Sequence, residues 1–239
     1  MTQPPLTPRQ RYRAQTAEEA KRIASRQLAE GGPGAISLNA IAKEMGLTGP
    51  AMYRYFASRD ELLAELATDA YNDLADVFQA AIGQEESPSP RARLHALATA
   101  WRKWALAQPH RYQLLFASAA GSGRAVPERT IPAAHRTMAL LFEALLQPLS
   151  ASSSSAEPPA ALERQLEQWV GNRPGPKVEG RVARLGLLFW TRLHGLLSLE
   201  LLGHFDVMGI DPALLFEAEV DALAGGGGGE EAPRRPRKR

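Results

Sequence analysis

The stretch ISLNAIAKEMGLTGPAMYRYFASR, residues 36–59, constrains the fold of this chain more than any other segment. Its first half has apolar residues at helical spacing, and the Ser37 hydroxyl can cap the first free amides of that helix. Gly46 supplies the positive φ that ends the helix. Thr48 can cap a third helix, in which Pro50 lies early enough that its missing N–H costs nothing. Two short helices joined by such a turn predict a helix-turn-helix.

This segment belongs to the basic end of the chain. Residues 1–59 hold nine Lys or Arg against four Asp or Glu, which gives a net charge of +5. Residues 60–229 carry −6, and residues 230–239 carry +3. Clustered positive charge attracts phosphates, so a basic head on an acidic body favours a protein whose head binds nucleic acid.

The remaining chain shows helical spacing and no strand pattern, so we expect an all-α protein. The first helix is expected from Thr16 to Glu30, with Thr16 and Glu19 as its capping box. Ser58 is expected to cap a long fourth helix that runs to about Ile82. Further helices are expected after residues 87–89, after Pro109, and over residues 131–149, 162–170, 181–203 and 211–224.

These patterns divide the chain into four expected parts. Residues 1–15 are expected to form a flexible basic arm, and residues 16–66 a helix-turn-helix domain. A long helix joins this domain to a larger helical domain, residues 67–224, which precedes a disordered Gly-rich and basic tail over residues 225–239.

Two further observations bear on where the protein works. The chain has no Cys and its first residues contain no apolar run, which suits the cytoplasm and gives no sign of a secretory signal. The most apolar segment, residues 181–203, includes Arg192 and Glu200, so we expect it to pack in a protein core and not in a membrane.

Residues 16–66 resemble the DNA-binding domain of TetR-family transcriptional regulators. The residues that carry the resemblance are Ser37, Ile41-Ala42, Gly46-Leu47-Thr48, Tyr53-Arg54-Tyr55-Phe56 and Arg59-Asp60-Glu61-Leu62-Leu63. The resemblance implies contacts with double-stranded DNA from Ser37, Thr48, Gly49, Pro50, Tyr53, Arg54, Tyr55 and Arg59. Tyr53 and Tyr55 would bind phosphates, whereas Thr48 and Arg54 could touch bases. Leu38, Ile41, Leu47 and Phe56 are assigned to packing.

Two alternatives remain open in this head. Tyr53 could instead belong to a small core with Phe56. Arg9, Arg11 and Arg13 could reach the minor groove as a flexible arm, or they could form a merely solvated tail.

The second half resembles, more loosely, the branch of TetR regulatory domains named for a Trp-His-Gly signature, here Trp190, His194 and Gly195. This resemblance implies ligand sensing and a homodimer paired through residues 181–203 and 211–224. His194 could meet a ligand, meet the partner subunit, or donate to a carbonyl in the core.

An apolar ligand pocket is the further expectation for this half of the chain. Its candidate residues are Trp101, Trp104, Phe116, Met138, Phe142, Trp190 and His194. The same residues could equally be ordinary core. We expect no cofactor, no metal site and no enzymatic activity, because no catalytic constellation stands out in the sequence.

The leading hypothesis is therefore a homodimeric, cytoplasmic repressor that binds a near-palindromic operator. A small, largely apolar effector would release it from DNA. The alternatives are a constitutive or activating DNA-binding regulator without an effector, and a non-regulatory helical interaction protein.

Overall fold

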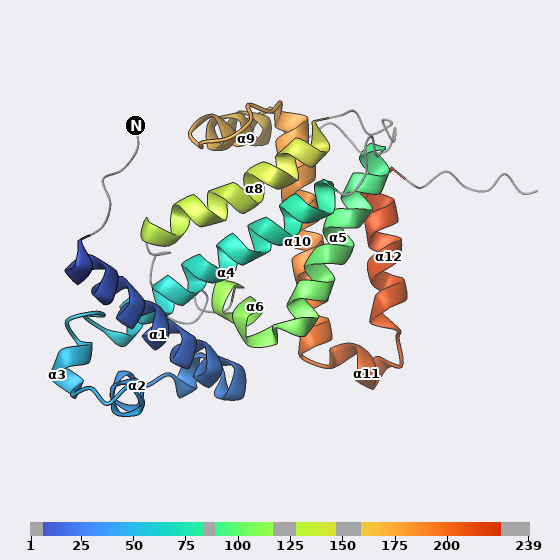
Figure 1. Cartoon of the computed structure of the whole chain (residues 1–239). Helices are drawn as coiled ribbons and strands as arrows, with labels where there is room; N and C mark the ends of the chain where they lie inside the picture. The colour runs from blue at the N-terminus through green and yellow to red at the C-terminus, as the bar shows by residue number, and fades with distance from the viewer. Residues whose placement is uncertain (1–6, 84–88, 117–127, 147–158, 226–239) are drawn as a thin grey trace, which may run out of the picture. The chain divides into compact units, whose positions relative to one another are not determined.

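The computed structural model describes residues 7–83, 89–116, 128–146 and 159–225. Every regular element in this part of the chain is a helix, so the all-α prediction is confirmed (Figure 1). The helices form two compact units, which are described separately below. Unit 1 comprises Met1–Asp76 with Trp104–Thr137, and unit 2 comprises Val77–Lys103 with Met138–Arg239.

Unit 1 contains the elements on either side of the predicted glycine turn. They are α1 (Pro8–Gly31), η1 (Pro33–Ala35), α2 (Leu38–Glu44), α3 (Gly49–Met52), most of α4 (Arg59–Ile82), α6 (Pro109–Phe116), η2 (Glu128–Thr130) and the start of α8 (Ile131–Leu145). The unit therefore joins the predicted helix-turn-helix domain to helices from later in the sequence.

The start of α1 differs from the sequence prediction. Thr7, not Thr16, is the N-cap, and it forms a reciprocal capping box with Gln10. Pro8 at the first helical position favours this start, because its fixed φ suits a helix and its missing N–H is not needed there. Thr16 lies inside the helix, where its hydroxyl donates to the Tyr12 carbonyl at 2.9 Å. Residues 8–15 are thus helical and do not form a flexible arm, while residues 1–6 lie outside the described residues.

The core of unit 1 holds the short helices together. Ile23 and Leu28 of α1 pack with Ile41 of α2 and Met52 of α3 in one buried cluster. The packing residues predicted from the sequence are confirmed, because Leu38, Ile41 and Phe56 are buried and Leu47 packs partly buried against them. Leu114 of α6 joins this same cluster and is 3% exposed.

Unit 2 is built around one long helix. Its elements are most of α5 (Pro90–Ala107), the second half of α8, α9 (Ala160–Gly171), α10 (Gly180–Leu201), α11 (His204–Met208) and α12 (Pro212–Leu223). Phe189, Leu193 and Leu197 are fully buried on α10, which packs against α9 and α12. Of the described helices, none is long and apolar enough to cross a membrane.

The sequence did not predict α11, which turns the chain between α10 and α12 (Figure 1). Gly203 and Gly209 flank it in the left-handed conformation, with φ of 73° and 65°. Glycine, which has no Cβ, adopts this conformation readily, so Gly203 and Gly209 form the bends at the two ends of α11. The predicted cap of α12 is confirmed, since the Asp211 carboxylate accepts the Ala213 N–H at 2.8 Å.

Candidate nucleic-acid interface

The turn between α2 and α3 is fixed by backbone hydrogen bonds. The Leu47 N–H donates to the Ala42 carbonyl at 2.8 Å, and the Gly46 N–H donates to the Lys43 carbonyl at 3.2 Å. This pair of bonds is a Schellman motif, which requires positive φ at its central residue. Gly46 has φ of 66° and meets that requirement.

Both helices of the motif begin at a hydroxyl cap, as predicted. Ser37 accepts the Ala40 N–H at 3.3 Å, and Thr48 accepts the Ala51 N–H at 3.4 Å. The Ser37 N–H is itself held by the side-chain oxygen of Gln27 at 3.1 Å, which ties the start of α2 to α1.

The predicted DNA-contacting residues differ in exposure. Ser37, Thr48, Pro50, Tyr53 and Arg54 are exposed, whereas Gly49, Tyr55 and Arg59 are half-buried. Tyr53 is 50% exposed, so it does not belong to a small core with Phe56, which is 4% exposed. Tyr55 is the tyrosine that packs against the core cluster.

Asn39 was not among the residues chosen from the sequence. Its side-chain oxygen lies 3.1 Å from the place where a Cβ on Gly49 would stand, so it borders the start of α3. Lys43 follows it by one turn on α2, and both side chains are exposed. Carboxamides can pair with base edges and ammonium groups with phosphates, which suits both residues to this surface. The sequence pattern that indicates this surface is the pair of polar residues, Asn39 and Lys43, on the side of α2 opposite the buried Ile41.

Arg59 has an internal role that the sequence did not indicate. Its Nε donates to the Ile36 carbonyl at 3.0 Å, and its terminal Nη2 donates to the Pro33 carbonyl. These bonds tie the first residue of α4 to the segment that precedes α2. The phosphate contact predicted for Arg59 stays a prediction.

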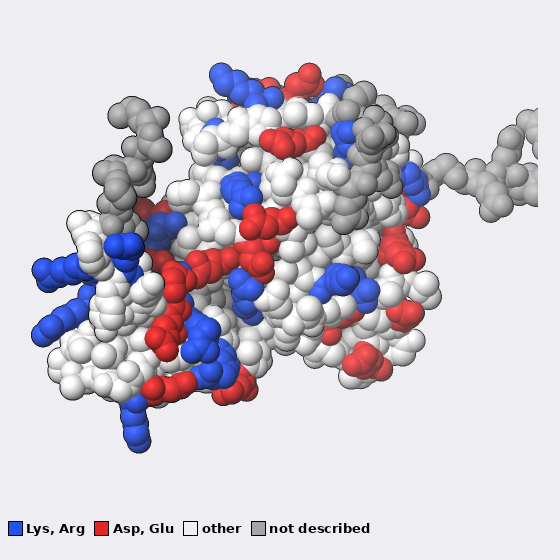
Figure 2. Space-filling model, viewed as in Figure 1, with Lys and Arg blue, Asp and Glu red and all other residues white. Residues whose placement is uncertain are grey.

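Basic side chains outnumber acidic ones in the part of the chain around the motif, with nine Lys or Arg against four Asp or Glu in residues 1–59. Figure 2 shows Lys and Arg projecting from the part of unit 1 that Figure 1 labels α1 to α3. Glu44 forms an ion pair with Arg26, so its charge is offset. Arg13 donates to the Arg54 carbonyl at 3.1 Å, which places a basic residue of α1 beside the end of the α3 segment.

The structure divides the seven predicted ligand residues between the two units. In unit 1, the Trp104 indole N–H donates to Asp73 at 2.8 Å, and Asp73 also pairs with Arg111 at 2.8 Å. Phe116 packs edge-on against Tyr71, with ring centroids 6.4 Å apart.

The other five candidates lie in unit 2. Trp101 is buried between Phe78 and Phe189, with ring centroids 6.4 Å and 6.2 Å away. Met138 and Phe142 are also buried, whereas Trp190 and His194 are half-buried. Burial lowers the pKa of His194 below its ordinary value, which favours the neutral imidazole. A pocket lined by these residues stays a prediction.

Comparisons with known proteins match both halves of the chain to bacterial transcriptional regulators. Residues 22–66 match the family model described as bacterial regulatory proteins of the tetR family, and residues 94–223 match the tetracyclin repressor-like C-terminal domain. The chain is 33% identical over 218 residues to the HTH-type transcriptional regulator Rv1816 of Mycobacterium tuberculosis, covering 88% of this chain and 92% of the relative.

Solved structures share the fold. A crystal structure of the regulatory protein SCO4313 is 44% identical, with a TM-score of 0.71, and the match covers 92% of this chain and all of that one. FadR from Bacillus subtilis, solved in complex with stearoyl-CoA, has a TM-score of 0.59 at 11% identity and covers 87% of this chain and 98% of that one. The second likeness shows the fold alone.

Proposed function

The chain belongs to the TetR family of bacterial regulatory proteins, and we propose that it is a repressor that binds a near-palindromic operator as a homodimer. It is a DNA-binding transcriptional regulator and not an enzyme. In this proposal a small, largely apolar effector binds in unit 2 and releases the protein from DNA in the cytoplasm. The observation that carries the proposal is the exposed, capped helix pair α2 and α3 on a basic surface.

The start of α3 is suited to approach bases closely. Thr48, Gly49 and Pro50 have small side chains, and Thr48 and Pro50 are exposed. We assign base contacts to Thr48 and Arg54, because hydroxyl and guanidinium groups pair with base edges in the major groove. Ser37, Tyr53, Tyr55 and Arg59 are assigned to phosphates, which fix the register of the helix without reading sequence.

Exposed apolar side chains support the homodimer. They are concentrated from the last turn of α10 to the first turns of α12, at Leu199, Leu202, Val207, Met208, Ile210, Leu214 and Leu215. Exposed apolar side chains that are gathered together are typical of surfaces that bind another protein, so this group is suited to a second subunit. A two-fold dimer would place its two α3 helices about 34–36 Å apart, one turn of DNA.

The effector is proposed to contact the aromatic residues of unit 2. Trp101, Met138 and Phe142 supply apolar surface, and Trp190 and His194 are half-buried one turn apart on α10. The similarly folded FadR was solved with stearoyl-CoA, whose acyl chain is apolar. For this chain, the support for an apolar effector is the apolar surface of the side chains named above.

The test begins with selection of fragments from the source organism's own DNA by the full-length protein. The selected operator is then titrated with the wild type, with Arg54→Ala and with Arg164→Ala. Arg164 is an exposed residue of α9, so its variant controls for the loss of one positive charge. We expect Arg54→Ala to weaken operator binding about 5- to 150-fold, since a good base contact contributes about 1–3 kcal/mol.

Three results would contradict parts of the proposal. Equal operator affinity of Arg54→Ala and Arg164→Ala would refute the assigned interface. A monomer mass in sedimentation at every concentration would refute the homodimer. Unchanged operator affinity in the presence of the source cell's apolar small molecules would favour a regulator without an effector.

A further inference from the structure

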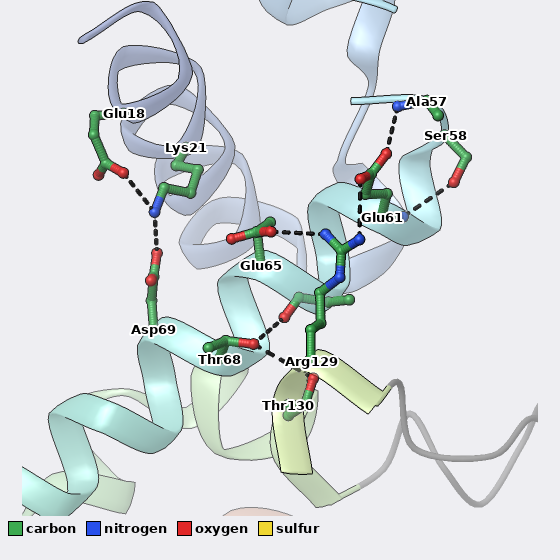
Figure 3. Close-up of polar contacts among 11 residues, drawn as sticks. Glu18, Lys21, Ala57, Ser58, Glu61, Glu65, Thr68, Asp69, Arg129 and Thr130 are labelled. Carbon is green, nitrogen blue, oxygen red and sulfur yellow. Dashed lines mark hydrogen bonds and ion pairs between the residues drawn. The ribbon is translucent and has the colours of Figure 1, made fainter. Parts of the chain in front are cut away.

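Arg129 joins two carboxylates on one face of α4 (Figure 3). Its Nη2 lies 3.1 Å from Glu61 Oε1, and its Nη1 lies 2.7 Å from Glu65 Oε1. Glu61 and Glu65 are one helical turn apart, so a single planar guanidinium can bind both at once. Arg129 belongs to η2, which leads directly into α8.

The Glu61 carboxylate also holds the turn between α3 and α4. Its second oxygen accepts the Ala57 N–H at 2.6 Å, while the Glu61 N–H donates to the Ser58 hydroxyl at 3.0 Å. This is a variant of the capping box, in which the glutamate reaches one residue further back than usual. The Ala57 N–H and, after it, Arg129 lower the pKa of Glu61, so the carboxylate stays charged and binds both donors.

A second contact fixes η2 beside α4. Thr130 is 2% exposed, and its hydroxyl oxygen lies 3.4 Å from that of Thr68. Thr68 follows Glu61 by two helical turns and is anchored to the Ala64 carbonyl at 2.8 Å. Because Thr130 is the residue after Arg129, this contact holds the guanidinium over the two glutamates (Figure 3).

We propose that Arg129 is a positioning residue for DNA recognition, acting through Glu61 on the turn that follows α3. The residues Tyr53, Arg54 and Tyr55 lie between α3 and that turn, so their placement depends on how firmly the turn is held. Arg129 itself touches none of the proposed DNA contacts. The inference rests on the proposed DNA surface, and it adds a residue more than sixty positions away in the sequence.

Arg129 and Thr130 lie directly before α8. α8 starts in unit 1 directly after Thr130, and its later residues, from Met138, belong to unit 2. A displacement of η2 from α4 would remove Arg129, one of the two donors to the Glu61 carboxylate. The ordered turn would then lose a charged partner, and the affinity for DNA would fall.

The competing explanation is that Arg129 forms an ordinary surface ion pair, which contributes little. The chain contains a matched control for it. Arg136, on α8, pairs with Asp76 of α4 at 2.6 Å, and its side chain is 45% exposed against 44% for Arg129. Asp76 is far along α4 from Ala57, so loss of this second pair should not reach the turn.

The experiment compares full-length wild type with Arg129→Ala, Arg129→Lys, Glu61→Gln and Arg136→Ala. The first measurement is hydrogen exchange at the Ala57 amide in the free protein. We expect Arg129→Ala to speed this exchange about 5- to 10-fold. The Glu61 carboxylate, which accepts the Ala57 N–H, loses its charged partner in this variant and holds the amide less firmly. Arg129→Lys should restore part of the protection, because an ammonium can still reach one carboxylate. Arg136→Ala should exchange like wild type.

The second measurement is affinity for a random-sequence DNA duplex at low salt, which needs no knowledge of the operator. We expect Arg129→Ala to bind it several-fold more weakly than Arg136→Ala at equal thermal midpoints. Equal Ala57 exchange in Arg129→Ala and Arg136→Ala would overturn the inference, as would faster exchange with unchanged DNA affinity. If the wild type bound no DNA at all, the proposed function would fail, while the exchange data would still report on the Arg129–Glu61 contact.

Discussion

Gly186 of α10 lies tightly against Phe142 of α8, and this contact makes a quantitative prediction. A Cβ added at this buried glycine would stand 2.6 Å from Phe142 Cε1 and 3.0 Å from Phe142 Cδ1. The Phe142 ring is 4% exposed and lies edge-on against Trp169, with centroids 5.8 Å apart. It therefore cannot move aside without giving up packing on another side.

The magnitude for Gly186→Ala follows from two opposed terms. Alanine in place of glycine inside a helix stabilises by about 1 kcal/mol, whereas an extra methyl in a packed core costs about 1–3 kcal/mol. We expect a net loss of up to about 2 kcal/mol in the free energy of unfolding. In a Phe142→Leu background the atom at 2.6 Å is absent. The same change should then stabilise the protein, which gives a coupling energy of about 1–3 kcal/mol.

The assay is urea denaturation of wild type, both single variants and the double variant at one protein concentration. Far-ultraviolet circular dichroism reports the loss of helix. Gly186 and Phe142 are buried within the chain, so neither substitution alters a surface that a second subunit could cover. A Gly186→Ala protein as stable as wild type, or a coupling energy near zero, would refute the steric argument.

Four further outcomes follow from local geometry and burial. Gly46→Ala should cost about 1–2 kcal/mol in unfolding experiments, because φ of 66° is strained for any Cβ even where space is free. Arg102→Ala should lower the free energy of unfolding by about 1.5–3 kcal/mol, because it removes the ion-pair partner of the Glu200 carboxylate, which is 10% exposed. Arg192→Ala should lower the free energy of unfolding by less than about 1 kcal/mol in the same assay, because the Arg192–Glu219 pair is exposed. Burial raises the pKa of Tyr71 to about 12 from an ordinary 10.0. The unfolded chain therefore ionises first, stability falls as pH rises from 10 to 12, and Tyr71→Phe should make that fall shallower in pH-dependent melts.

Local patterns were enough to predict the helix-turn-helix. The Ser37 and Thr48 caps, the Gly46 turn and the apolar face of α2 each depend on neighbours within a few residues. The start of α1 was predicted wrongly even though it is also a local feature. Two capping boxes compete there, and the one at Thr7 gains from Pro8 at the first helical position.

The contacts that the sequence could not indicate join residues far apart along the chain. Arg59 binds carbonyls 23 and 26 positions away, and Arg129 binds glutamates 64 and 68 positions away. Their partners depend on how helices pack, which no spacing rule encodes. α11 was missed for a different reason: it has five residues, which is too short for a periodic pattern.

The burial of Leu114 in the core of α1 and α2 limits how this regulator could be recombined with its relatives. An exchange of DNA-reading heads between family members at residue 66 would follow the order of the sequence. It would also separate the head from Leu114 and from Arg129, the partner of Glu61, because both α6 and η2 lie beyond that junction. A transplant that carried residues 104–137 with the head would keep these contacts. The structural unit that contains this head is therefore discontinuous in sequence.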